Sequence, residues 1–314
     1  MIHFFSKKNI VITGGTGFIA GHIFSRLKPF AQSISLLSKA SSSDDSITQV
    51  NYQDIESLRP HIEKADIIFH LAAQTSAYRA EENPALDLQC NLIPLLNILE
   101  ICKTMDKIPT VIFASTVTIF GIHEPPLRTS LSPDMPSSFY DLHKLHGEDY
   151  LNYYIKNKHI NGCSLRLANV YGPGSKESSV DRGIINIMIK KILSNQNITI
   201  FGNGKYIRDF IYISDVANSF LEAAIHIKKC NGRKFIISSG QGHQFLNVIN
   251  TIIQLANKLK TINPLIEFTP FSDKALNIEK RNFIGDNTDF ISLTNWKPKI
   301  SLEQGITLTM ETLL

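Results

Sequence analysis

Tyr140 and Lys144 are the residues of this chain whose types and spacing most clearly suggest chemistry. They stand four apart in the run FYDLHK, and a helix over Ser138–Lys156 would place both side chains on one face. A free tyrosine has a pKa of about 10, so it is a poor acid or base at neutral pH. A neighbouring ammonium stabilises the phenolate and lowers that pKa. The pair could therefore exchange a proton with a substrate hydroxyl.

A hydroxyl-bearing segment precedes this pair in the chain. Ser115 and Thr116 follow an expected strand over Thr110–Ala114, and either hydroxyl could bind the substrate oxygen beside the tyrosine. A tyrosine and a lysine four apart are also common on solvated helix surfaces. The catalytic interpretation therefore depends on a dinucleotide site elsewhere in the chain.

The segment Lys8–His22 predicts such a site. The apolar run Ile10–Ile12 is typical of a buried parallel strand, and glycines and then a helix-spaced apolar pattern follow it. This arrangement directs free N–H groups and the positive end of a helix at one spot, which suits a pyrophosphate. Gly14 permits the tight turn, Gly17 lets the backbone approach the phosphates, and Ala20 lets the helix pack on the strand.

The type of dinucleotide depends on the end of the second expected strand, Ser33–Leu37. A carboxylate there would accept hydrogen bonds from the adenosine ribose, but the chain has Ser38 and Lys39. These residues could hold a 2′-phosphate, which favours NADP slightly over NAD; alternatively, Lys39 is a solvated loop charge. Further cofactor contacts are expected at two strand ends. They involve Asp54 and Ile55 at the adenine edge, and the small or apolar residues Leu71, Ala72 and Ala73 after the strand Asp66–His70.

Alternating strands and helices up to about residue 174 indicate an α/β fold with a Rossmann-type, doubly wound parallel sheet. In the expected helix Ala85–Met105, Pro94 predicts a kink or a late start. The sixth strand is expected over Ser164–Val170. We expect residues 1–174 to form the dinucleotide-binding domain, with segments near 205–240 returning to it. Residues 175–314 should mainly form a smaller substrate-binding cap.

Composition limits the function classes. A net charge of +4 over 314 residues, without a basic block, gives no reason to expect nucleic acid as a partner. The four scattered cysteines are typical of reduced thiols, and no histidine or cysteine spacing indicates a metal site. The first strand begins almost at once and no apolar run reaches membrane-spanning length, so we expect no membrane association and a cytoplasmic location.

The chain resembles the extended short-chain dehydrogenases/reductases, in particular nucleotide-sugar epimerases and dehydratases. The matching segments, which follow the family's order over nearly the whole chain, are TGGTGFIAG (Thr13–Gly21), HLAA (His70–Ala73), ASTVTIFG (Ala114–Gly121), YDLHK (Tyr140–Lys144), RLANVYGPG (Arg166–Gly174), RDFIYISDV (Arg208–Val216) and NWKP (Asn295–Pro298).

The resemblance implies that Thr116, with Ser115 as the alternative, is the catalytic hydroxyl. Tyr140 is then the general acid/base, and Lys144 its activator and ribose ligand. Together, the residues and the resemblance predict this dinucleotide-binding set: Gly14, Gly17, Phe18, Ile19, Ser38, Lys39, Asp54, Ile55, Leu71, Ala72, Ala73, Asn91, Tyr140 and Lys144. The predicted substrate-binding set is Thr75, Thr116, Asn169, Phe201, Arg208 and Arg281. In that set the two arginines and Asn169 lie near the diphosphate, and Phe201 packs on the nucleotide base.

Val117 and Thr118 stand where the family's 4,6-dehydratases carry an acidic pair, which argues against a dehydratase. The missing glutamate at Thr118 also argues against a xylose-forming decarboxylase. The leading hypothesis is an NAD(P)-dependent epimerase of a nucleotide-diphosphate sugar, acting at C4 through a keto intermediate without net redox change.

Two alternatives remain open. An NADPH-dependent 4-keto-sugar reductase would use the same residues but consume cofactor, and Ser38-Lys39 favours it. A non-catalytic dinucleotide-binding sensor is disfavoured by the complete set of catalytic residues. The sequence names neither the sugar nor the base. The helices after Ala85 and Ser138 could pair two copies as a homodimer.

Overall fold

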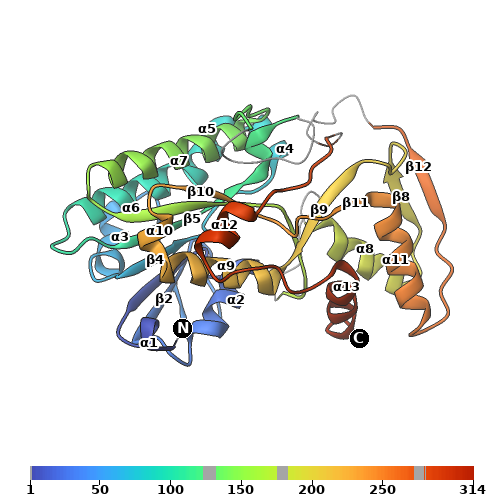
Figure 1. Ribbon diagram of the computed structural model, residues 1–314, viewed down its shortest axis with the longest axis horizontal. Coiled ribbons are helices and arrows are strands. Elements are labelled where there is room, and N and C mark those ends of the chain that lie inside the picture. The colour runs from blue at the N-terminus through green and yellow to red at the C-terminus, as the bar shows by residue number, and fades with distance from the viewer. Residues whose placement is uncertain (1, 123–131, 175–182, 272–278, 280) are drawn as a thin grey trace.

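A seven-stranded, fully parallel sheet forms the centre of the molecule (Figure 1). Its parallel, doubly wound arrangement is the one that the sequence predicts. The computed structural model describes residues 2–122, 132–174, 183–271, 279 and 281–314. The strands, in sheet order, are β10 (Lys234–Ile237), β6 (Asn161–Leu167), β5 (Thr110–Thr116), β4 (Ile67–His70), β1 (Asn9–Thr13), β2 (Ser33–Ser38) and β3 (Ile47–Gln49). The chain thus runs from β1 outward to β3 and then returns to β4 on the other side of β1.

Helices cover both faces of this sheet, each over its own apolar core (Figure 1). One face carries α2 (Phe18–Leu27), α9 (Ile213–Ile225), α10 (Ile227–Cys230) and α12 (Thr288–Leu293). The other carries α3 (Ile55–Ile62), α6 (Ile93–Lys103) and α7 (Phe139–Lys156), with α4 (Ala77–Glu82) and α5 (Pro84–Asn91) packed on α7. The short helices α1 (Ile2–Phe5) and η1 (Val117–Phe120) complete this half.

Pro94 divides the long helical run as expected: α5 ends at Asn91 and α6 begins at Ile93. Together, Pro84–Lys103 are long and apolar enough to cross a membrane by length and composition, so the prediction that no run reaches this length is wrong. Leu95, Ile98 and Leu99 of α6 are fully buried against the sheet. Their apolar character is therefore accounted for by the protein core.

The expected strand Ser164–Val170 is two strands, so that prediction is wrong. After β6, the N–H of Ala168 makes the last hydrogen bond to β10, at Ile237 O. The chain then leaves the sheet, and β7 (Asn169–Tyr171) pairs in parallel with β9 (Ile207–Tyr212). Side chains cover both β6 and β7, so the apolar residues continue along the sequence where the chain passes from one sheet to the other. The sequence pattern therefore gives no sign of the break.

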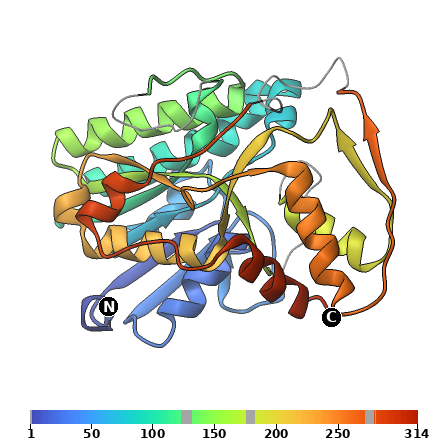
Figure 2. The same ribbon diagram turned by 45° about the vertical axis from the view of Figure 1, so that its right-hand side comes forward.

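The C-terminal half builds a separate core at one end of the molecule (Figure 2). The strand β11 (Gly242–Gln244) pairs antiparallel with β9, and β8 (Ile198–Phe201) pairs in parallel with β12 (Ile266–Thr269). The helices α8 (Ile184–Leu193), α11 (Phe245–Asn257) and α13 (Leu302–Glu311) pack over these strands. The sequence patterns did not predict the short strands β10, β11 and β12.

Candidate active site

The predicted cofactor and catalytic residues meet at the carboxyl edge of the main sheet. Adjacent strands β2, β1, β4 and β5 end, in that order, at Ser38, Thr13, His70 and Thr116. The chain reverses its direction of travel across the sheet between β1 and β4, and α/β proteins of this kind bind ligands in the crevice outside such a point.

The turn after β1 has the shape of a phosphate cradle. Gly14 has a φ of 72°, and a Cβ there would lie 3.0 Å from the backbone nitrogen of Ala72. A Cβ on Gly17 would lie 2.8 Å from Gly14 O. Gly17 is also the N-cap of α2 and offers no side chain to its first N–H groups. The backbone therefore approaches closely and leaves donors for an anion, which fits a dinucleotide pyrophosphate.

Tyr52 holds this turn in place, a role that the sequence patterns did not suggest. Its phenol donates to Leu37 O at 2.7 Å and accepts the N–H of Gly14 at 2.9 Å. On the other side, the Thr13 hydroxyl accepts the N–H groups of Leu71 and Ala72, each at 3.0 Å. The predicted contact residues after β4 are thus fixed against the glycine turn.

Ser38 and Lys39 lie at the carboxyl end of β2, where the adenosine ribose of the dinucleotide is expected, and they differ in their surroundings. Ser38 is buried; its Oγ lies 3.2 Å from Thr16 Oγ1 and accepts the N–H of Ala40 at 3.1 Å. Lys39 is exposed. Asp54 caps α3 by accepting the N–H of Glu56 at 3.0 Å. The carboxyl of Asp54 and the hydroxyl of Ser38 therefore have structural partners already, and Lys39 is the exposed cation at this end.

Lys144 ties the catalytic helix to the strand that carries Thr116. Its ammonium donates to Ala114 O at 2.9 Å and lies 4.8 Å from the centre of the Phe113 ring. Burial lowers the pKa of Lys144 to about 8, while the carboxylates of Asp87 and Glu148 oppose that shift. Tyr140 is half-buried and lies one helical turn earlier on α7.

Ser115 serves a different purpose from Thr116. Its hydroxyl donates to Glu148 Oε1 at 2.6 Å, and Glu148 also receives two hydrogen bonds from the fully buried Arg166. Arg166 reaches Asp134 as well, and Lys234 lies 2.9 Å from the same carboxylate. Ser115 is therefore engaged in this buried network, whereas Thr116, the last residue of β5, is not.

Asn91 and Thr75 have unsatisfied polar atoms close to a buried contact between an aspartate and a histidine. Asp87 binds His143 at 2.6 Å and accepts from Asn91 at 2.8 Å and from Gln74 at 2.7 Å. Within the described residues, Asn91 Oδ1 and Thr75 Oγ1 are buried without a hydrogen-bond partner. Buried polar atoms in this state are suited to a ligand or a bound water.

The two predicted diphosphate-binding arginines lie together although they are far apart in sequence. Arg208 packs its guanidinium 4.8 Å from the ring centre of Tyr206 and donates to Glu279 O and Arg281 O. Arg281 is 5% exposed, and its Nε and Nη1 have no partner in the part of the chain that the structure describes. Burial and, to a smaller extent, nearby Arg208 lower the pKa of Arg281 to about 9, while the carboxylate of Asp141 opposes the shift.

Aromatic side chains continue from this arginine pair to Phe201. Phe201 is 51% exposed and its ring centre lies 6.4 Å from that of Phe271, which lies 6.3 Å from that of Tyr206. Asn169, on the strand beside Arg208, donates to Asp209 O at 3.0 Å. One region therefore contains the predicted substrate residues Phe201, Arg208, Arg281 and Asn169. In it, Arg281 interacts with the charge of Asp141, the residue that follows Tyr140 in the chain.

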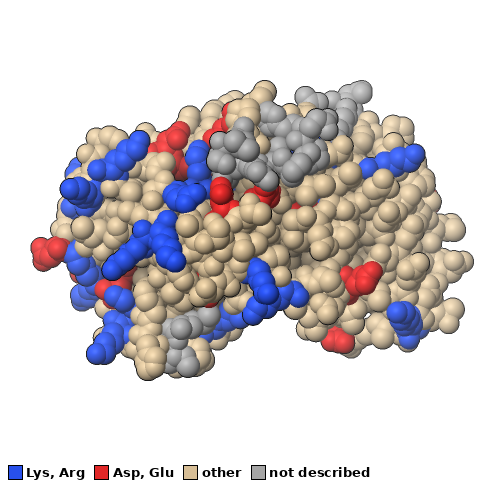
Figure 3. Space-filling model, in the orientation of Figure 1, with Lys and Arg blue, Asp and Glu red and all other residues tan. Residues whose placement is uncertain are grey.

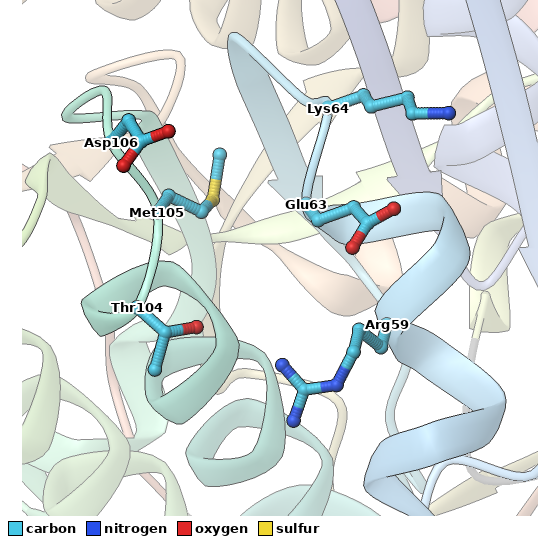
Figure 4. A pocket seen from close by; sticks show the side chains of 6 residues that line it. All are labelled: Arg59, Glu63, Lys64, Thr104, Met105 and Asp106. Atoms are coloured by element: carbon cyan, nitrogen blue, oxygen red, sulfur yellow. The ribbon is translucent and has the colours of Figure 1, made fainter.

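A second candidate pocket lies on another part of the molecule, away from the predicted site residues. It is lined by Arg59, Glu63, Lys64, Thr104, Met105 and Asp106 (Figure 4). These residues end α3 and α6, and so lie at the amino edge of the sheet, opposite the glycine turn. On the face shown in Figure 3, Lys and Arg side chains are more numerous than Asp and Glu and lie mainly over the left half of a largely uncharged surface.

A glycine cradle beside a tyrosine–lysine pair on a doubly wound sheet defines the class of a dinucleotide-dependent oxidoreductase of the short-chain dehydrogenase type. Residues 10–238 match the model of the NAD dependent epimerase/dehydratase family. The chain belongs to this family, which confirms the expected fold, family and dependence on NAD or NADP.

Named relatives agree with this assignment. A putative UDP-glucose 4-epimerase of Methanocaldococcus jannaschii is 29% identical, over 95% of each chain. The crystal structure of UDP-glucose 4-epimerase with UDP-glucose from Thermotoga maritima superposes with a TM-score of 0.85, at 27% identity, over 97% of this chain and 98% of that one. The Thermus thermophilus UDP-glucose 4-epimerase complex with NAD gives a TM-score of 0.83, at 26% identity, over 96% and 97%.

Proposed function

We propose that this protein is a UDP-sugar 4-epimerase that uses a bound NAD or NADP. The observation that carries the proposal is the buried Arg281 guanidinium, whose Nε and Nη1 lack partners among the described residues, beside Asp141. A buried cation with unpaired donors is costly unless an anion completes it. A diphosphate held there would place its sugar next to Tyr140, the neighbour of Asp141.

The chain's own residues can carry out the proton transfer that the reaction needs. The bound dinucleotide supplies a reversible hydride acceptor. Lys144, buried yet charged at neutral pH, stabilises the phenolate of Tyr140. Tyr140 takes the proton from the sugar hydroxyl, and Thr116 orients that hydroxyl from the end of β5.

UDP as the nucleotide is inferred from the relatives and from the exposed ring of Phe201. A flat base can stack on this ring, while Arg208 and Arg281 bind the two phosphates. We propose the division into residues 1–174, with returning segments near 205–240, and a cap of mainly 175–314. β10 lies in the main sheet and β8 in the C-terminal core, which supports this division.

We further propose a cytoplasmic homodimer paired through α5 and α7. Leu86 on α5 and Phe139, Tyr150 and Tyr153 on α7 are between 40% and 63% exposed. Exposed apolar side chains on two adjacent helices provide the core of an interface. Gel filtration with light scattering gives the mass directly: about twice 35.2 kDa supports the pairing, and the monomer mass contradicts it.

The function is tested by incubating the purified protein with a panel of UDP-sugars and detecting C4 epimers, with Tyr140→Phe as control. Formation of an epimer by the wild type alone supports the proposal. The 4-keto-sugar reductase is kept as a second candidate because exposed Lys39 stands where a 2′-phosphate would lie. Stoichiometric consumption of NADPH with a keto sugar, without epimer formation, would establish the reductase instead.

A further inference from the structure

The hydroxyl of Thr116 belongs to a row of three hydrogen-bonded side chains. Its Oγ1 lies 2.8 Å from Thr118 Oγ1 and accepts the N–H of Thr118 at 3.1 Å. The Thr118 hydroxyl in turn donates to Asp141 Oδ1. Three side chains, from β5, from η1 and from the first turn of α7, are therefore connected in sequence.

The direction of these hydrogen bonds follows from counting protons. A hydroxyl has one proton to donate, and an ionised carboxylate only accepts. Thr118 uses its hydroxyl proton to donate a hydrogen bond to Asp141. The hydrogen bond between the two threonine hydroxyls must therefore be donated by Thr116. One lone pair of Thr116 receives the N–H of Thr118, and the other remains for a substrate hydroxyl.

Several hydrogen-bond donors and a cation surround the carboxylate of Asp141. It is 1% exposed and is the third residue of α7, near the positive end of an 18-residue helix. The N–H and hydroxyl of Ser137 lie 3.4 and 3.5 Å from Oδ2. The cation of Arg281 interacts favourably with the same carboxylate.

We propose that Thr116, Thr118 and Asp141 form a proton relay, a second route for the sugar proton beside Tyr140. As the sugar O–H bond breaks, its proton forms a bond to Thr116, whose own proton passes to Thr118. The proton of Thr118 passes to Asp141, and the hydrogen and electron pair of the adjacent C–H bond go to the dinucleotide. Thr116 then donates to the keto oxygen, and the return step reverses every transfer.

This inference rests on the proposed function, and it explains why a carboxylate is buried directly after the catalytic tyrosine. The relay accepts from an alcohol and donates to a ketone, so it suits both states of an epimerised carbon. Asp141 does not contact the sugar. It orients the hydroxyl of Thr118 and is the final acceptor of the proton that passes along the two hydroxyls.

The test compares Thr118→Val with Thr118→Ser in the wild-type background and in Tyr140→Phe. Valine keeps the shape of Thr118 but interrupts the row; serine restores the hydroxyl. We expect Thr118→Val to lower kcat about tenfold or more with KM changed less than about twofold, and Thr118→Ser to recover most of the rate. In Tyr140→Phe, the residual rate should fall about tenfold further on adding Thr118→Val.

Thr309→Val is the matched control, because Thr309 is also buried and donates at 2.7 Å to Gly305 O within α13. It should leave kcat unchanged, and melting temperatures verify that every variant is folded. Wild-type turnover with an unaffected Thr118→Val variant overturns the relay alone. Equal losses in Thr118→Val and Thr118→Ser also overturn it. Absence of turnover in the wild type overturns the proposed function, and the relay with it.

Discussion

Replacement of Arg281 by methionine should make the ligand-free protein more stable and its nucleotide binding weaker. Arg281 is 5% exposed, and two of its donors have no partner among the described residues. Each unsatisfied buried donor costs about 1–3 kcal/mol, and a charged one more. Methionine keeps most of the aliphatic stem and removes the charged guanidinium, whose carbon lies 5.5 Å from the centre of the Phe283 ring. A net gain of about 2 kcal/mol in the free energy of unfolding corresponds to a rise of roughly 4 °C in Tm.

The same substitution removes charge-assisted hydrogen bonds to the diphosphate. Such bonds contribute about 1.5–3 kcal/mol, so the Kd of UDP should increase roughly tenfold to a hundredfold. Differential scanning fluorimetry without ligand and isothermal titration with UDP measure the two effects. Arg233→Met, at an exposed arginine, should change neither quantity. A fall in Tm, or a Kd within twofold of wild type, would refute the assignment of Arg281 as a buried anion-binding cation.

Three further substitutions test how the site is supported. Tyr52→Phe should cost about 1–3 kcal/mol in urea unfolding and weaken dinucleotide binding, because a buried N–H of the glycine turn loses its acceptor; equal NAD affinity would contradict this. Glu148→Gln should destabilise the protein by about 1.5–3 kcal/mol, because the buried Arg166 loses one of its two carboxylate partners and keeps only Asp134, whereas Glu56→Gln on the surface should cost under about 1 kcal/mol. Lys144 has a pKa lowered to about 8 by burial, so the folded state binds fewer protons than the unfolded state above that pH. Between pH 8 and 10.5, the free energy of unfolding of the wild type should therefore rise by up to about 3 kcal/mol relative to that of Lys144→Met. A difference in unfolding free energy that stays constant with pH would exclude the lowered pKa of Lys144.

Local patterns in the sequence were sufficient to predict the cofactor half of the fold. The strand Ile10–Ile12, its glycines and the following helix are consecutive in the chain, so their geometry is encoded locally. The break at Pro94 was predictable for the same reason. The change of sheet after Leu167 was not, because β7 pairs with β9, whose register depends on tertiary packing rather than on neighbouring residues.

The site shows the same division between local and distant information. Tyr140 and Lys144 share a helix face, so their association followed from spacing. Arg208 and Arg281 are 73 residues apart, and their proximity followed from family resemblance rather than from any local pattern. Asp141 stood beside Tyr140 in the sequence, but its hydrogen bond to Thr118 crosses from α7 to η1 and depends on the folded arrangement of both.

Proton NMR of UDP-sugars incubated with the purified protein tests the central claim most directly. The wild type should convert a UDP-sugar to its C4 epimer until both are at equilibrium, without net accumulation of reduced dinucleotide. Tyr140→Phe should slow that conversion about a hundredfold or more. Conversion at an undiminished rate in Tyr140→Phe, or no epimer from any UDP-sugar with the wild type, would contradict the account.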